Sequence, residues 1–253
     1  WYSIFHAISA FCNAGFDLFG RFGEFSSLAP YVGDYLVNYV IMALITVGGI
    51  GFVVWDDAIR HKLRISKYSF HSKMVLSISA SLILTAFVTF FVLEYNNTLA
   101  NLNLFEKITA SMFLSVTPRT AGFNTVSMGD LTDSSKLITI VLMLIGGSPG
   151  STAGGMKTTT LAVMLMSTMA AIRGEDETVV FKRRLERSVI HQAVAILTAY
   201  IAVVVVSTVV ISAYENLPLL DVLFETASAA GTVGVTTGIT PSLKNLSKII
   251  VII

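Results

Sequence analysis

The stretch SVTPRTAGFNTVSMGD, residues 115–130, lies between long apolar segments and contains a proline, an arginine and two glycines. Such residues are unusual at membrane depth, because a backbone N–H or C=O without a partner is costly in hydrocarbon. Non-helical backbone is tolerated there where it lines a water-filled cavity. The stretch therefore predicts a segment that enters the membrane and returns, rather than one that crosses it.

The composition of the whole chain indicates a polytopic membrane protein. Of the 253 residues, 54% are hydrophobic and only 13% are charged, and the mean hydropathy is +0.74. A soluble domain of this length would need more charged surface. The single cysteine, Cys12, excludes an internal disulfide. The chain starts at Trp1 within an apolar segment and stops at KIIVII, so we expect it to be part of a longer protein.

The hydropathy pattern predicts several spans, since about 20 apolar residues cross a bilayer. Lys and Arg gather in residues 57–73 and 173–187, which the positive-inside rule makes cytoplasmic. The three segments that then face outward are each too long for a plain turn. The predicted spans are 36–55, 74–93, an interrupted 137–172, 189–213 and the start of another at 249–253; the outer segments are 1–35, 96–134 and 214–244.

The three outer segments form an internal repeat. FHAISAFCNAGFD has a phenylalanine and a serine ten and six residues before Gly15, and FETASAAGTVGVT has the same pair before Gly234. In MFLSVTPRTAGFNT the corresponding Phe113 and Thr117 are one residue out of register with Gly122. The glycines are 107 and 112 residues apart. A nearly constant period of one hairpin unit predicts repeats arranged around an axis.

Each repeated segment has the features of a pore loop. Glycine adopts φ > 0 without steric cost, which lets successive carbonyls face the axis and replace the hydration shell of a cation. A short helix before the turn would add its negative C-terminal end, and Glu106 and Glu225 are expected near helix starts. No ring of carboxylates occupies the turn, which favours a monovalent ion. The predicted filter residues are Asn13, Ala14, Gly15, Phe16, Thr120, Ala121, Gly122, Phe123, Thr232, Val233, Gly234 and Val235.

A second polar interruption, GGSPGSTAGGMKTTT at 146–160, breaks the third long apolar segment. Its glycines and Pro149 cannot sustain a helix, and a lysine inside a membrane indicates function. We expect this loop to lie below the filter and to gate the pore, with Lys157 adding an electrostatic barrier. The predicted gate residues are Gly146, Gly147, Ser148, Pro149, Gly150, Ser151, Thr152, Ala153, Gly154, Gly155 and Lys157.

Other interpretations of these motifs are weaker. A lone glycine in a span usually marks close helix packing, but three at matching places favour pore loops. GSTAGGMKT resembles a phosphate-binding loop, yet Met156 separates Gly155 from Lys157 and no strand precedes it. His6, Cys12 and Asp17 have no orienting partner that would make a nucleophilic site. Arg119 is expected to point away from the ion path as a structural brace. An intramembrane enzyme would need paired catalytic groups at one depth, and the sequence offers none.

With the motifs placed, the chain resembles the Trk/Ktr/HKT superfamily of potassium transporters. The resemblance is carried by SAFCNAGFDLFG, SVTPRTAGFNTV, GGSPGSTAGGMKTTT and SAAGTVGVTTG, and it covers essentially the whole chain. It implies an all-α polytopic membrane fold of helix–pore loop–helix units, four in complete members, with the first repeat missing here. The implied divisions are 1–73 for the second repeat, 74–188 for the third with its gating loop at 146–160, and 189–253 for a truncated fourth.

The resemblance also implies the biology of the chain. We expect potassium uptake across the plasma (inner) membrane, with no enzymatic activity and no cofactor beyond potassium ions at the filter. The channel-like subunit of a potassium-pumping ATPase is the alternative. Expected partners are a second copy of the chain, the lipid bilayer and a cytoplasmic ring of nucleotide-binding regulatory subunits. No nucleic acid is expected to bind.

Overall fold

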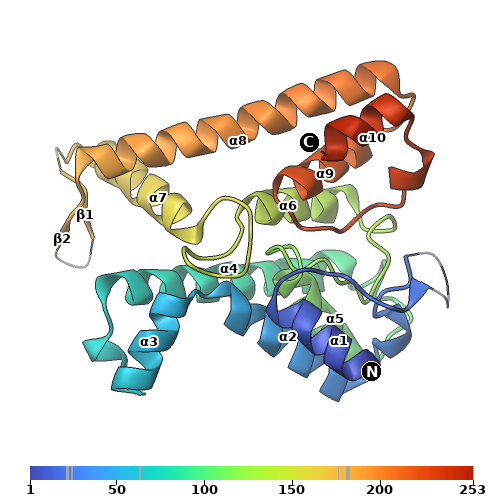
Figure 1. The fold of residues 1–253 in the computed structure, drawn as a ribbon, viewed down its shortest axis with the longest axis horizontal. Coiled ribbons are helices and arrows are strands. Elements are labelled where there is room, and N and C mark those ends of the chain that lie inside the picture. The colour runs from blue at the N-terminus through green and yellow to red at the C-terminus, as the bar shows by residue number, and fades with distance from the viewer. Residues whose placement is uncertain (21–22, 24, 63, 176, 181–182, 253) are drawn as a thin grey trace.

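The computed structural model describes residues 1–20, 23, 25–62, 64–175, 177–180 and 183–252. Its regular secondary structure is helical, as the sequence predicts, apart from one small hairpin within the expected cytoplasmic loop at 173–187 (Figure 1). Asp176, Phe181 and Lys182 of that loop, and Ile253 of the last predicted span, lie outside the described residues. The helices are α1 (Tyr2–Phe11), α2 (Tyr35–Gly49), α3 (Phe52–His61), α4 (Phe70–Glu94), α5 (Leu104–Val116), α6 (Asp133–Leu144), α7 (Thr158–Ile172), α8 (Arg187–Tyr214), α9 (Leu219–Ala230) and α10 (Asn245–Ile252); the hairpin pairs β1 (Val179–Val180) with β2 (Arg183–Arg184).

Two long helices confirm predicted spans at 74–93 and 189–213. Among the described residues, α4 with 25 residues and α8 with 28 residues are each long and apolar enough to cross a membrane. Large apolar side chains of α8 face outward, and Val203, Val206 and Val209 are each more than half exposed. In water such a surface would be costly, whereas lipid covers it. The two helices run lengthwise through the molecule (Figure 1).

The internal repeat is visible in the order of the elements. In each repeat a short helix (α1, α5 or α9) is followed by a glycine turn. The next α-helix along the chain (α2, α6 or α10), called the inner helix, follows that turn. In the last two repeats an outer helix, α4 or α8, precedes the short helix and packs against it. Pro118 follows the end of α5 at Val116, as expected for a residue that cannot donate the next helical bond.

The predicted span at 36–55 is wrong in one respect, because the helix breaks. The axes of α2 and α3 differ by 99°, and Gly51 between them has φ +93°. A methyl group at Gly51 would lie 2.6 Å from the carbonyl oxygen of Pro149. The turn therefore needs glycine for its backbone angle and for the close approach of the 146–160 loop. Hydropathy alone does not detect such a break, since its flanks remain apolar.

The third long segment is interrupted where the sequence predicts, but over a shorter stretch. Residues 145–157 separate α6 from α7. Thr158 and Thr160, which the sequence predicts to be part of the gating loop at 146–160, belong to the first turn of α7. The backbone N–H of Thr158 still donates to Gly147 O at 3.0 Å, so this turn stays tied to the loop.

Candidate functional site

The three repeat glycines converge at one place. Gly15, Gly122 and Gly234 all line a single cavity of about 340 Å³. All three have positive φ, at +73°, +84° and +88°, as the pore-loop interpretation requires. A methyl group at Gly15 would lie 2.7 Å from Gly122 Cα, and one at Gly122 would lie 2.8 Å from Gly15 Cα. A side chain at either position would therefore clash with the neighbouring loop.

The backbone repeats its conformation on the inner side of each glycine. Asn13, Thr120 and Thr232 each lie two residues before their glycine, and their φ angles are +50°, +65° and +55°. Residues other than glycine rarely adopt this conformation, and it is most costly for β-branched threonine. Three such residues at one place in three loops show that a common turn geometry is maintained against local strain.

A hydroxyl group on each short helix, or directly after it, holds the outer side of the turn. Ser9 Oγ donates to Phe16 O at 2.8 Å, and Ser228 Oγ donates to Val235 O at 2.7 Å. Thr117 Oγ1 makes the same bond to the carbonyl of Phe123. In each loop the acceptor is the residue directly after the glycine. This hydrogen bond explains why a hydroxyl side chain recurs before each glycine. Thr117 makes it although it is one residue closer to its glycine than Ser9 and Ser228 are to theirs.

The predicted filter residues occupy distinct positions within these turns. Two carbonyl oxygens lie close to a neighbouring loop. A methyl group at Gly15 would lie 2.6 Å from Ala121 O, and one at Gly122 would lie 2.7 Å from Val233 O. Ala121 and Val233 are themselves buried. Phe16, in contrast, is 71% exposed, whereas Phe123 is fully buried.

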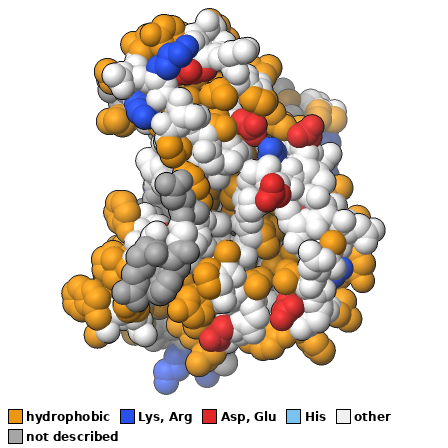
Figure 2. Space-filling model, turned by 90° about the vertical axis from the view of Figure 1, so that its right-hand side faces the viewer, with side chains coloured by type: hydrophobic (Ala, Val, Ile, Leu, Met, Phe, Trp, Pro, Cys, Tyr) orange, Lys and Arg blue, Asp and Glu red, His pale blue; other side chains and the backbone are white. Residues whose placement is uncertain are grey.

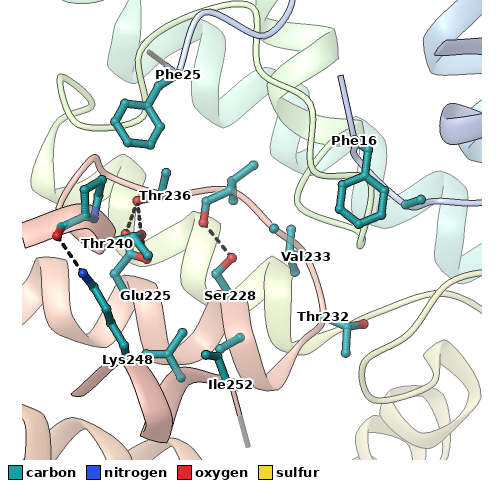
Figure 3. A pocket seen from close by; sticks show the side chains of 16 residues that line it. Phe16, Phe25, Glu225, Ser228, Thr232, Val233, Thr236, Thr240, Lys248 and Ile252 are labelled. Carbon is teal, nitrogen blue, oxygen red and sulfur yellow. Dashed lines mark hydrogen bonds between the residues drawn. The ribbon is translucent and has the colours of Figure 1, made fainter. Parts of the chain in front are cut away.

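The ring of loops is open on one side. Gly234 lies near Gly122, since a methyl group at Gly234 would lie 3.9 Å from Gly122 Cα. The same methyl group would have no contact with Gly15 within 4 Å. A cavity of about 760 Å³ occupies that side, with Ala14 and Phe16 at one wall and Thr232 and Val233 at another. Figure 3 shows Phe16 separated from the α9 side chains across this cavity.

The loop between α6 and α7 lies directly against the inner side of the turns. Thr152 Oγ1 is 2.9 Å from Phe11 O and 3.0 Å from Asn13 Oδ1. A methyl group at Gly154 would lie 1.8 Å from Thr232 Oγ1. The structure therefore brings the predicted gate residues Thr152 and Gly154 to the positive-φ residues of two different turns.

Backbone bonds rather than helical turns maintain this loop. Gly146 N donates to Met156 O at 2.8 Å, which joins its two ends. Ser148 N and Thr152 N donate to Gly49 O and Gly48 O at 2.9 Å and 3.2 Å. The break after α2 thus supplies acceptors for the loop.

Other predicted gate residues complete the segment. Ser151 Oγ accepts from Ala153 N at 3.3 Å, and Phe52 N donates to Gly150 O at 2.9 Å. Gly155 has φ +65°, and a methyl group there would lie 3.3 Å from Gly231 O beside the third turn. Lys157 Nζ donates to Ala153 O at 2.7 Å, which places its charge at the loop itself.

Three ionisable side chains of the repeated segments can be compared with their predicted places. Glu225 is in the middle of α9, not near its start, where Asp221 is the acidic residue instead. Glu106 does lie in the first turn of α5, in a capping box with Asn103. Arg119 is buried and points away from the turn, with Nη2 3.1 Å from Ser79 Oγ on α4. The expected brace therefore has a named partner.

The outer face of the molecule carries scattered acidic side chains among hydrophobic ones (Figure 2). Asp17 and Asn124 line the 340 Å³ cavity in front of the glycines. Within the described residues, no cluster of His, Cys, Asp or Glu suited to a bound metal is found. The other polar side chains that line this cavity are the hydroxyl groups of Ser27, Ser127, Thr236 and Thr237.

The chain is similar to proteins that transport cations. Residues 1–253 match the TrkH family, described as cation transport protein. Ktr system potassium uptake protein B of Bacillus subtilis is 42% identical over 253 residues, which are 99% of this chain and 56% of that protein. Potassium/sodium uptake protein NtpJ of Enterococcus hirae is 39% identical, over 100% of this chain and 56% of that protein.

A solved structure has the same fold. The potassium transporter TrkH from Vibrio parahaemolyticus superposes with a TM-score of 0.76 at 19% identity, over 99% of this chain and 54% of that one. The chain thus spans about half the length of the relatives that it matches. The family match covers every residue, and it agrees with the repeated glycine turns: this chain belongs to the TrkH family of cation transport proteins.

Proposed function

We propose that this chain forms three of the loops of a potassium-selective pore and takes part in potassium uptake across the plasma (inner) membrane. The observation that carries the proposal is the convergence of Gly15, Gly122 and Gly234 on one cavity. Peptide oxygens around such a point can replace the water molecules of a weakly hydrated monovalent cation. The names of the two relatives, which include potassium and potassium/sodium uptake, support the same ion class.

A fourth loop would complete the ring. The open cavity between Gly234 and the first turn supports a missing repeat at that place. The family resemblance implies four such units, so a further unit of the full-length protein would supply this loop. The choice between potassium and sodium would then depend on that loop as well as on the three loops of this chain.

The loop at 145–157 is proposed as the gate. It lies on the inner side of the turns, and its contacts with Asn13 and Thr232 support a role in closing the path. Its glycines allow it to move, and the charge of Lys157 opposes a cation beneath the filter. Ion movement would then follow the electrochemical gradient once the loop is displaced.

The proposed partners follow from the resemblance and from charge. A second copy of the chain would form a homodimer in which each copy has its own pore. A cytoplasmic nucleotide-binding ring would dock near the basic loops at 57–73 and 173–187. The comparisons give no support to the alternative, a subunit of a potassium-pumping ATPase.

Replacing Gly122 with serine in the full-length protein tests the filter. The serine must adopt φ +84° and place its Cβ 2.7 Å from Val233 O. We expect potassium uptake relative to sodium uptake to fall about tenfold or more, since strain of this kind costs about 1–3 kcal/mol. Gly20→Ser is the control, because a Cβ at Gly20 has nothing within 4 Å. An unchanged uptake ratio in Gly122→Ser would overturn the filter assignment.

A further inference from the structure

Two buried polar side chains on the short helices occupy equivalent places. His6 on α1 is nine residues before Gly15, and Glu225 on α9 is nine residues before Gly234. They are only 5% and 4% exposed. A buried polar group is costly unless it is hydrogen-bonded.

Both side chains accept a hydrogen bond from the same backbone position. Leu18 N donates to His6 Nε2 at 3.3 Å, and Thr237 N donates to Glu225 Oε1 at 3.0 Å. Each donor is the third residue after its glycine. Chemically different side chains thus perform one task, which is to accept the N–H group that follows the turn on the outer side.

The ring of His6 is oriented for this task. Nδ1 lies 2.7 Å from the carbonyl oxygen of Tyr2, so Nδ1 carries the hydrogen and Nε2 keeps its lone pair for Leu18. The ring stacks on Phe19, with centroids 4.4 Å apart. The packing and the Nδ1 bond therefore fix the direction in which Nε2 accepts.

Glu225 holds a longer piece of its loop. Oε2 accepts from Thr240 Oγ1 at 2.7 Å, and Oε1 also accepts from Thr236 Oγ1. Figure 3 shows Glu225 below Thr236 and Thr240, with Ser228 beside it on the same helix. The carboxylate and the Ser228 hydroxyl thus hold adjoining parts of the outer segment from behind.

The middle loop uses a different support. With its shift of one residue, the corresponding helix position is Leu114, which has no acceptor. Instead, Asn124 N donates to Ser27 Oγ at 3.2 Å, and Leu28 N donates to Asn124 O at 2.9 Å. The outer segment of the middle loop is therefore hydrogen-bonded to the outer segment of the first loop.

We propose that His6 and Glu225 are positioning residues for ion selection: each fixes the outer segment of its pore loop by accepting the amide three residues after the filter glycine. This inference rests on the proposed function, because it concerns the same filter. Loss of either acceptor frees the segment beyond the glycine, and the carbonyls can then relax around the smaller sodium ion. Selectivity falls while the fold remains.

Uptake by the full-length protein in liposomes tests the assignment. In His6→Leu and Glu225→Leu the acceptor is lost, and we expect the potassium-to-sodium uptake ratio to fall at least fivefold. His6→Gln and Glu225→Gln retain an acceptor oxygen and should restore the ratio to within twofold of the parent protein. Leu114→Met, at the matching place in the middle loop, removes no such bond and should leave the ratio unchanged.

A second measurement separates this inference from the proposed function. Hydrogen exchange on the parent protein reports on the amides of Leu18 and Thr237 without any transport, and we expect both to be as protected as the short helices. Rapid exchange at these amides, or an unchanged ratio in both leucine variants, overturns the positioning role. A parent protein that takes up no potassium overturns the proposed function instead, and the exchange data still decide the positioning role.

Discussion

Thr152 Oγ1 lies 3.0 Å from Asn13 Oδ1, and this contact joins the interrupted third span to the base of the first pore loop. The two residues are 139 positions apart in the chain. Asn13 also reaches the second loop, where its Nδ2 donates to Arg119 O at 3.4 Å. One side chain therefore connects the proposed gate with two walls of the proposed filter.

Replacing Thr152 with valine removes this connection and preserves the shape of the side chain. A hydrogen bond of this kind contributes about 0.5–1.5 kcal/mol net. We expect the closed position of the loop to be destabilised by that amount and potassium flux to rise about two- to tenfold. Flux of rubidium as a potassium substitute, measured in liposomes, gives the result.

Thr85→Val is the matched control for that change. Within the described part of the chain, Thr85 donates only to carbonyls of its own helix, α4, and it is exposed on the outside of the molecule. Its replacement should leave flux unchanged. A Thr152→Val protein whose flux equals that of the parent or falls below it would show that the contact does not hold the loop closed.

Replacing Ser228 with alanine tests the hydroxyl support behind the third turn. The carbonyl of Val235 then loses its donor at 2.7 Å and becomes free to rotate. A buried acceptor without a partner costs about 1–3 kcal/mol, so the turn should adopt other conformations and the potassium-to-sodium uptake ratio should fall about five- to tenfold. Ser242→Ala is a suitable control, because Ser242 is exposed and bonds only the local carbonyl of Ile239. Equal ratios in Ser228→Ala and Ser242→Ala would contradict a role for the hydroxyl.

Glu215 at the outer end of α8 predicts a pH dependence of stability. Its carboxylate accepts from Ser247 Oγ and from the backbone N–H of Lys244, each at 2.7 Å. These bonds, first that of Ser247, lower the pKa of Glu215 below its usual value. Because the folded pKa is depressed, the stabilisation is present above the unfolded pKa of about 4.3. It is lost as the pH falls through the lower folded pKa.

The Glu215→Gln protein should therefore melt at a lower temperature than the parent at pH 7. The difference should shrink as the pH falls below the unfolded pKa and through the lower folded pKa, because the parent carboxylate then takes up a proton. Thermal unfolding in detergent at several pH values measures both proteins. A difference in melting temperature that is independent of pH would show that the charge of Glu215 is not involved.

The glycine repeat was predictable because it rests on local chemistry. A backbone turn with φ > 0 requires glycine, so Gly15, Gly122 and Gly234 stand out in the sequence at matching places. The broken third span was predictable for the same reason, since Pro149 and its neighbouring glycines cannot remain helical. Backbone features that require one residue type at one position can be predicted from the sequence alone.

Features that depend on contacts between distant segments were not predictable. The bend after Gly49 is required by a loop nearly 100 residues later in the chain, and its apolar flanks conceal it. Glu225 appeared suited to a helix start, whereas its partners are threonines beyond the turn. The recurring serine before two of the glycines was a visible signal of the hydroxyl support, but only the fold shows that Thr117 plays the same part.

Anomalous diffraction from crystals of the full-length protein soaked with thallium, a heavy substitute for potassium, tests directly whether the three glycine turns surround an ion site. We expect thallium density on the axis between Gly15, Gly122 and Gly234, within coordination distance of the peptide oxygens of the turns. This density should be lost when excess potassium competes. Density confined to surface carboxylates, with no ion between the three glycines in the absence of competing potassium, would contradict this expectation.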